Sequence, residues 1–224
     1  MDSRPNIAID GPAGSGKSTV AKKVAEELGF LYIDTGAMYR AVTLKALRNG
    51  VDFDDLAALG EVAASAVVDL IAGPDGSLKV LLDHEDVTEE IRSPNISRSV
   101  SLTARVPAVR KRLVELQQAM AKQGGVVMEG RDIGTVVLPN ARIKIFLTAS
   151  SGERSRRRLQ ELSAKGYEIA QYQMEKEILE RDRLDATREI GPLTPAPDAE
   201  IIDCTDLSIE QVVGLITDRA LAGR

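Results

Sequence analysis

The sequence of 224 residues contains no tryptophan, one cysteine and one histidine, and only 3% of its residues are aromatic. The single cysteine, Cys204, excludes an intramolecular disulfide and favours a reducing compartment. One cysteine and one histidine are also too few for a structural zinc site. His84 lies beside Asp83, Glu85 and Asp86, a pattern typical of an exposed histidine rather than a catalytic one.

Three further absences narrow the class of protein. No stretch approaches the roughly 20 apolar residues of a membrane span, and the N-terminal residues lack the apolar core of a signal peptide, so we expect a cytoplasmic protein with no membrane partner. The net charge of −5 argues against a nucleic-acid partner, because such proteins generally carry a basic surplus. Nothing in the sequence indicates an obligate interface, and we expect a monomer.

Residues 11–18 read GPAGSGKS and match the phosphate-binding pattern G-x-x-x-x-G-K-[ST] at every fixed position. An apolar segment at 7–10 predicts a strand before this P-loop, and residues 17–28 predict a helix after it. Backbone N–H groups of such a loop surround phosphate oxygens, Lys17 can reach the β- and γ-phosphates, and Ser18 can bind Mg²⁺. The sequence therefore predicts an ATP site formed by Gly11, Pro12, Ala13, Gly14, Ser15, Gly16, Lys17, Ser18 and Thr19.

The segments after the P-loop indicate a parallel sheet interrupted by an insert. A strand at 30–33 and a helix at 37–49 complete a βαβα opening, which is typical of parallel sheets. Two β-like runs at 67–71 and 78–82, joined by a turn cluster at 73–77, instead predict an antiparallel hairpin. We predict an α/β, three-layer P-loop NTPase fold with core residues 1–61 and 101–224, and a small β-rich insert at 62–100.

The second half of the chain returns to alternating helices and strands, followed by a polar helical region at 151–188 that we interpret as a lid. The predicted helices are 107–123, 151–164, 169–186 and 208–221, the last capped by Ser208, and the predicted strands are 126–128, 143–147 and 200–204.

A polar segment, Asp34-Thr-Gly-Ala-Met-Tyr-Arg40, follows the second predicted strand, at the edge where ligands of open α/β sheets lie. The helix that begins there favours an anion at its N-terminus, Tyr39 can stack on a ligand, and Arg40 can bind a phosphate through two hydrogen bonds. A simple helix cap with a surface arginine is the alternative, and the adjacent P-loop disfavours it.

A second polar segment, Glu129-Gly-Arg-Asp132, follows the predicted strand at 126–128. Its glutamate resembles the carboxylate that holds Mg²⁺ or its water in P-loop enzymes. Arg131 and Asp132 can bind a phosphate and a base, respectively. A solvated turn is the less favoured interpretation at this edge of the sheet.

Arginines of the predicted lid share one helical face, since Arg154, Arg157 and Arg158 are spaced i, i+3 and i+4. They could stabilise charge on a transferring phosphoryl group. They could equally belong to a solvated helix, because Glu153 and Glu161 lie four residues on either side of Arg157. The lack of a guanine-reading Asn-Lys-x-Asp run disfavours a GTP switch, and a second phosphate site beside a lid favours a kinase.

The chain closely resembles bacterial-type cytidylate (CMP) kinase, a P-loop nucleoside monophosphate kinase, over essentially its whole length. The P-loop alone is unspecific, but the combination of segments is highly specific, and the insert at 62–100 is similar to the enlarged nucleoside-monophosphate-binding domain of this type. The resemblance rests on IDGPAGSGKS (9–18), DTGAMYR (34–40), EGRDIGT (129–135), KIFL (144–147) and ERDRLDATR (180–188).

The resemblance implies a reversible transfer of the ATP γ-phosphoryl group to CMP or dCMP with Mg²⁺, giving CDP or dCDP and ADP, in pyrimidine nucleotide metabolism. It implies catalytic roles for Lys17, Arg131, Arg157 and Arg158. Ser18 would bind the metal, and Glu129, where aspartate is more usual in the family, is a candidate to hold it through a water.

The resemblance also implies the contacts to CMP. The arginines would surround the acceptor phosphate, Ser101 and Asp132 would address the cytosine edge, and Asp185 the sugar. Thr35 stands where serine is usual and keeps the hydroxyl. The implied contacts are Thr35, Tyr39, Arg40, Ser101, Arg110, Arg131, Asp132, Asp185 and Arg188.

Two other functions stay open at the level of sequence. A P-loop kinase of another small molecule would ignore every nucleoside monophosphate, and a nucleotide-binding regulatory module would bind ATP without turning it over.

Overall fold

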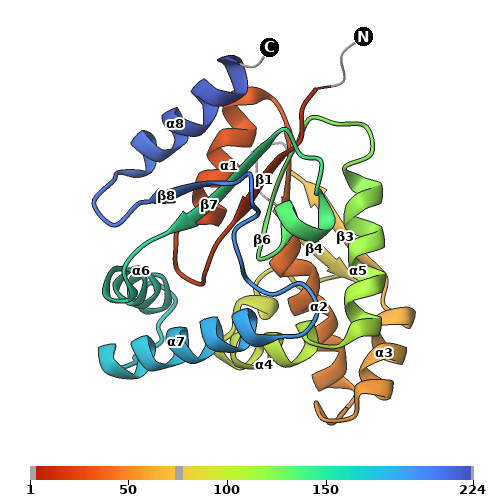
Figure 1. Ribbon diagram of the computed structural model, residues 1–224. Helices are drawn as coiled ribbons and strands as arrows, with labels where there is room; N and C mark the ends of the chain where they lie inside the picture. Colours follow the sequence, from red (N-terminus) through yellow and green to blue (C-terminus); the bar gives the residue numbers. More distant parts are fainter. Residues whose placement is uncertain (1–3, 74–77, 223–224) are drawn as a thin grey trace. The chain divides into compact units, whose positions relative to one another are not determined.

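The computed structural model describes residues 4–73 and 78–222 (Figure 1). The chain forms two compact units: residues 1–32 with 123–224, and residues 33–122. Within the described ranges, no helix is both long and apolar enough to cross a membrane.

Strands β1, β6, β7 and β8 of the first unit belong to a sheet of strand order β2-β6-β1-β7-β8, and the boundary between the units falls within β2. Strand β1 pairs in parallel with β6 and β7, and β7 pairs in parallel with β8, which confirms the predicted parallel sheet. The bounds are Ile7–Asp10 (β1), Leu31–Asp34 (β2), Val126–Gly130 (β6), Ile143–Thr148 (β7) and Glu200–Asp203 (β8).

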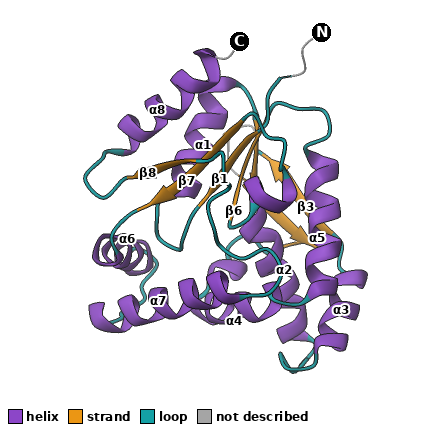
Figure 2. Ribbon diagram, in the orientation of Figure 1, coloured by secondary structure: helices purple, strands orange, loops and turns teal. Residues whose placement is uncertain are grey.

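Helices α1 and α8 pack against each other on one face of this sheet, as Figures 1 and 2 show. Their apolar faces and the strands share a buried cluster that includes Ile9, Val24, Leu147 and Ile216. Ser208 accepts a hydrogen bond from the Gln211 N–H, as its predicted capping role requires. The helical elements are α1 (Lys17–Leu28), α6 (Ser151–Ser163), α7 (Gln171–Thr187), α8 (Ile209–Ala222) and a π-helical turn, η2 (Ile133–Val137).

The register of the sheet brings two functional segments to one edge. Strands β1 and β6 run in parallel with Asp10 opposite Gly130. Both strands are buried along their whole length, and the first three residues of each are apolar, as expected of a strand that is covered on both faces. The P-loop and the segment that begins at Arg131 therefore leave the sheet side by side, at the edge predicted for ligands.

The second unit packs four helices with a three-stranded sheet of order β3-β4-β5. Its strands pair antiparallel, which confirms the predicted hairpin; of the predicted turn cluster, residues 74–77 lie outside the described residues. The elements are α2 (Thr35–Arg48), α3 (Leu56–Ser65), β3 (Val68–Ala72), β4 (Leu78–Leu82), β5 (Glu85–Asp86), η1 (Glu90–Arg92), α4 (Pro94–Ala104) and α5 (Pro107–Met120).

This unit differs from the sequence prediction in three respects. Helices α3 and α4 were not predicted. Helix α2 begins at Thr35 rather than residue 37, because the Asp34 carboxylate accepts a hydrogen bond from the Ala37 N–H at 2.9 Å and caps the helix two residues earlier. The compact unit, 33–122, is also wider than the segment 62–100, whose bounds as an insert stay a prediction.

Candidate nucleotide and acceptor site

The P-loop is held in a shape that only glycine permits at two positions. A Cβ on Gly11 would lie 2.1 Å from the Leu147 carbonyl oxygen, and one on Gly14 would lie 2.7 Å from the Arg154 carbonyl oxygen. Gly14 also has a φ of +75°, in the left-handed region that side chains disfavour. The loop is therefore packed closely between β7 and α6.

The polar groups of this loop fit a phosphate. Among the described residues, no side chain caps the N-terminus of α1, whose first N–H groups also have no partner within the helix. The Ser15 hydroxyl is buried and has no hydrogen-bond partner among those residues. A phosphate would supply acceptors for both kinds of group, and Ser18, the predicted metal ligand, lies in the first turn of α1.

Lys17 lies within a small buried network. Its Nζ donates to the Pro12 carbonyl at 3.2 Å and lies 4.0 Å from an oxygen of Glu129. The other oxygen of Glu129 accepts a hydrogen bond from the Tyr32 hydroxyl at 2.8 Å. Tyr32 was not predicted as a site residue, and it orients the carboxylate that faces Lys17.

Arg131 and Asp185 form an ion pair between two of the predicted acceptor residues. The Arg131 Nε donates to Asp185 at 2.8 Å, and the Asp185 side chain is buried. Burial alone would raise the pKa of Asp185, but the charges of Arg131, Arg181 and Arg188 outweigh burial and hold the pKa below its usual value. Asp185 is therefore ionised near neutral pH and holds Arg131 in place.

Asp132 and Arg188 form a second pair, with Nη2 of Arg188 3.3 Å from the carboxylate. Both side chains are almost fully buried, at 6% and 5% exposure. Arg188 also donates from Nε to the Gly191 carbonyl. The structure thus joins the predicted base-reading carboxylate to a predicted phosphate-binding arginine.

Arg154 and Asp182 hold the P-loop at Ala13; Asp182 was not predicted as a site residue, and Arg154 was considered only as one of the three arginines on one face of the predicted lid. Arg154 donates from Nη1 to the Ala13 carbonyl at 3.0 Å and to Asp182 at 2.5 Å. The other oxygen of Asp182 accepts from the Ala13 N–H at 3.3 Å. In the sequence, the only indication that either residue supports the site is that Arg154 shares a helical face with Arg157 and Arg158.

The two predicted lid arginines have different surroundings. Arg157 donates to the carbonyls of Ser15 and Cys204, at 3.2 and 2.8 Å, and to Glu153. Arg158 instead lies 2.6 Å from Glu161, so Glu161 pairs with Arg158 rather than with Arg157 as its spacing had suggested. Arg157 thus contacts the P-loop through its hydrogen bond to Ser15.

The remaining predicted acceptor residues belong to the second unit. The Arg110 guanidinium lies 5.8 Å above the ring of Tyr39, and both residues are buried. A Cβ on Gly36 would lie 3.1 Å from Nη1 of Arg40, so the missing side chain makes room for this arginine. Thr35 and Ser101, the other predicted contacts of this unit, are also buried.

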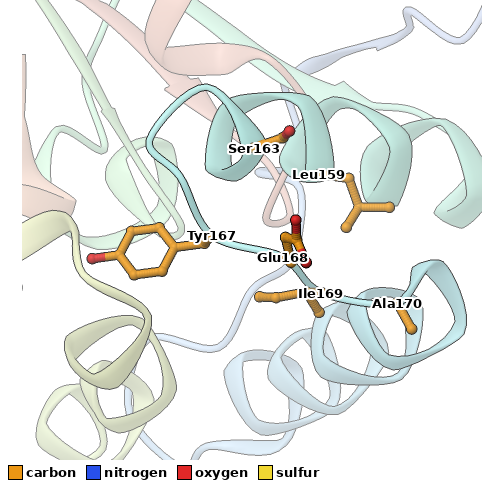
Figure 3. A pocket seen from close by; sticks show the side chains of 6 residues that line it. All are labelled: Leu159, Ser163, Tyr167, Glu168, Ile169 and Ala170. Carbon is orange, nitrogen blue, oxygen red and sulfur yellow. The ribbon is translucent and has the colours of Figure 1, made fainter.

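A separate hollow of about 420 Å³ lies at the connection between α6 and α7 (Figure 3). None of the predicted site residues lines it. Its apolar walls extend the small cluster of Leu162, Met174 and Ile178 that joins these two helices. The lining residues are Leu159, Ser163, Tyr167, Glu168, Ile169 and Ala170.

Comparison with known proteins agrees with this geometry. A solved structure of an uncharacterised protein from Eubacterium ventriosum is similar in fold, with a TM-score of 0.55 and 13% identity over 98% of this chain and 99% of that one. Among curated proteins, the chain is 66% identical to a cytidylate kinase from Pelotomaculum thermopropionicum, covering 100% of this chain and 99% of the relative. It is 56% identical to the cytidylate kinase of Desulforamulus reducens, over 94% of each chain.

The sequence model of the family described as cytidylate kinase matches residues 7–221, which span both units. The match includes the P-loop, the two ion pairs at the edge of the sheet and the buried arginine of α5. Kinases of this kind are phosphotransferases that act on small nucleotides and take a phosphoryl group from ATP. The chain belongs to the cytidylate kinase family of nucleoside monophosphate kinases.

Proposed function

We propose that this chain, acting as a monomer in the cytoplasm, transfers the γ-phosphoryl group of ATP to CMP or dCMP and catalyses the reverse reaction. The observation that carries the proposal is the pairing of a P-loop with two arginine–carboxylate pairs at one edge of the same sheet. A P-loop supplies the donor site. The two pairs supply a second site beside it, whose arginines can bind a phosphate and whose carboxylates can bind polar groups.

The donor end works by position and charge. The loop amides and the N-terminus of α1 hold the phosphates, while Lys17 stabilises the charge that develops on the γ-phosphoryl oxygens. Mg²⁺, when bound, would neutralise phosphate charge, held by Ser18 and, through a water, by Glu129. Arg157 and Arg158 act as the lid arginines, and their closure excludes water from the transfer.

The acceptor end places an oxygen of the monophosphate in line with the γ-phosphorus. Arg40, Arg110, Arg131 and Arg188 bind its phosphate, which fixes the geometry of attack without a strong general base. Thr35 and Tyr39 help to seat the nucleotide, and Asp185 binds the sugar. Ser101 and Asp132 recognise the cytosine edge.

The direct test is a coupled assay of ADP release with CMP, dCMP, UMP, AMP, GMP and no acceptor. We expect CMP and dCMP to be used far better than the other acceptors, and a negligible rate without acceptor. A kinase of another small molecule would show no rate with any of them, and a regulatory module would bind ATP without turnover. Either outcome would contradict the proposal.

Replacing Asp132 with asparagine should weaken discrimination between bases. The amide keeps the size of the side chain but replaces one acceptor oxygen with a donor, which mismatches the cytosine amino group. We expect the ratio of kcat/KM for CMP over UMP to fall about tenfold, since a polar contact that loses its partner costs roughly 1.5 kcal/mol. Steady-state kinetics with both acceptors measure this ratio, and an unchanged ratio would mean that Asp132 does not read the base.

Replacing Asp182 with asparagine should weaken ATP binding. Its carboxylate links Arg154 to the Ala13 N–H, and the neutral amide loses the charge-assisted part of both contacts. We expect KM for ATP to rise about fivefold, corresponding to roughly 1 kcal/mol, while KM for CMP stays the same. Glu180→Gln is the control, because Glu180 lies on the same helix, is exposed and pairs only locally with Arg183. Equal effects of the two substitutions would show that the contact with the P-loop is unimportant.

A further inference from the structure

Asp10, the last residue of β1, accepts two short hydrogen bonds that the proposed mechanism does not use. One carboxylate oxygen accepts the Ile133 N–H and the other accepts the Gly134 N–H, both at 2.8 Å. Asp10 is 4% exposed, so these contacts are shielded from water. Charge-assisted hydrogen bonds in such a setting are strong and directional.

The two N–H groups belong to the segment that carries the base-reading carboxylate. Ile133 begins the π-helical turn η2, and Asp132 immediately precedes it with φ −146° and ψ 30°. Short π-helical turns are rare and need local support. By holding the first two N–H groups of this turn, Asp10 fixes the direction in which the Asp132 side chain leaves the backbone.

Asp10 is also joined directly to Gly11, the first residue of the P-loop. The same carboxylate therefore ties the donor loop to the acceptor segment, across the paired ends of β1 and β6. Gly134 packs closely at this contact, since a Cβ there would lie 3.4 Å from the Asp10 oxygen and 3.3 Å from Cδ of Lys144.

We infer that Asp10 is a positioning residue for base specificity: its carboxylate orients Asp132 toward the acceptor base by fixing the N–H groups of Ile133 and Gly134. The inference rests on the proposed role of Asp132 in reading cytosine. It assigns Asp10 no contact with either nucleotide.

The pKa of Asp10 makes the predicted base specificity depend on pH. Burial raises the pKa of Asp10 to about 6, against the lowering effect of its two backbone hydrogen bonds. Asp132, just before η2, adds to the rise, and Lys17 of α1 opposes it. Lys144 of β7, the other charged side chain that packs near Gly134, is paired with Asp198. A protonated Asp10 can no longer accept both N–H groups as a carboxylate, so base specificity should decline below about pH 6.

The experiment compares Asp10→Asn with Asp132→Asn and with Asp203→Asn. Asp203 is a matched control, because it ends β8 of the same sheet and caps a backbone N–H, that of Thr205, at an exposed position. For each variant, kcat/KM is measured with CMP and UMP, and KM is measured with ATP. The wild-type ratio of CMP to UMP is also followed from about pH 5 to 8, where the two acceptor phosphates titrate alike and cancel.

For Asp10→Asn we expect the ratio of CMP to UMP to fall about fivefold, because one amide hydrogen now faces an N–H donor, while KM for ATP changes less than twofold. In the wild type the ratio of kcat/KM for CMP over UMP should fall below about pH 6. In Asp10→Asn this ratio should be independent of pH. Asp203→Asn should match the wild type.

Several outcomes would overturn the inference. Equal losses with CMP and UMP, together with a raised KM for ATP, would mean that Asp10 only supports the fold. If Asp132→Asn lowers the ratio and Asp10→Asn does not, the positioning role is wrong while the proposed function stands. If Asp132→Asn leaves the ratio unchanged, the base-reading part of the proposed function is wrong. Should Asp10→Asn fail to fold, a wild-type ratio that is constant from about pH 5 to 8 would still contradict the inference.

Discussion

Replacing Lys17 with alanine should lower kcat by roughly a hundred- to a thousandfold or more while leaving the fold intact, because one fixed charge near a transferring group contributes about 3 to 4 kcal/mol to transition-state stabilisation. Lys17 is only 7% exposed, and its Nζ donates to the Pro12 carbonyl, so its charge is held at the P-loop. The measurement is kcat at saturating ATP and CMP, with thermal unfolding to verify the fold.

Lys23→Ala is the matched control, because Lys23 lies on the same helix but is exposed and pairs with Glu210 of α8. An exposed pair of this kind contributes about 0 to 1 kcal/mol to stability and should not affect turnover. A kcat of Lys17→Ala near that of Lys23→Ala would contradict the assignment of the P-loop as the donor site. A loss of the folded state in Lys17→Ala would instead point to the buried contact with Glu129.

The parts of the fold that could be predicted from sequence are those where local signals agree with tertiary structure. Strand β1 and helix α1 begin and end where predicted, because a buried strand needs a continuous apolar run and a P-loop fixes the start of the next helix. Helices α3 and α4 were missed. Each overlaps one end of the segment predicted as β-rich, 62–100, and α3 is alanine-rich, with its buried face set by packing within the second unit.

The site shows the same division between local and tertiary information. Residues that belong to contiguous motifs, such as Lys17 and Asp132, could be proposed from sequence. The contacts that hold these motifs could not, since Asp10 is 123 residues away from Ile133 and Asp182 is 169 residues away from Ala13. Nothing in the sequence around an isolated aspartate tells which distant N–H groups it accepts, because such contacts are set by how the sheet and helices pack.

In the arginine-rich helices, arginines with the same kind of sequence spacing have different surroundings in the structure. Glu153–Arg157 and Glu180–Arg183 have the spacing of ordinary helix-surface pairs, and both pairs form. Arg157 nevertheless also contacts the P-loop backbone, whereas Arg183 is 60% exposed and contacts only its own helix. Helical spacing alone therefore could not separate arginines that support the site from solvated ones.

Replacing Arg188 with alanine should reduce kcat/KM for CMP by about 10- to 150-fold, because a charge-assisted contact with a phosphate contributes roughly 1.5 to 3 kcal/mol. The side chain is 5% exposed, so its charge is shielded from water, and it lies 3.3 Å from Asp132. The substitution removes both the proposed phosphate contact and a partner of Asp132, the carboxylate proposed to read the base. We therefore also expect a smaller preference for CMP over UMP.

Arg183→Ala serves as the control for this prediction. Arg183 lies five residues earlier in the sequence, within α7, and forms an exposed ion pair with Glu180. It should change kcat/KM for CMP less than twofold, because an exposed pair of this kind contributes about 0.5 kcal/mol or less. Binding of ATP without CMP, measured by calorimetry, should be unaffected in both variants, because Arg188 is proposed to bind the acceptor phosphate and Arg183 is exposed. If Arg188→Ala were as mild as Arg183→Ala, the end of α7 would be a salt-bridged surface and the acceptor phosphate would have to bind elsewhere. If Arg188→Ala weakened the binding of ATP as much as that of CMP, Arg188 would support the whole edge of the sheet rather than the acceptor site alone.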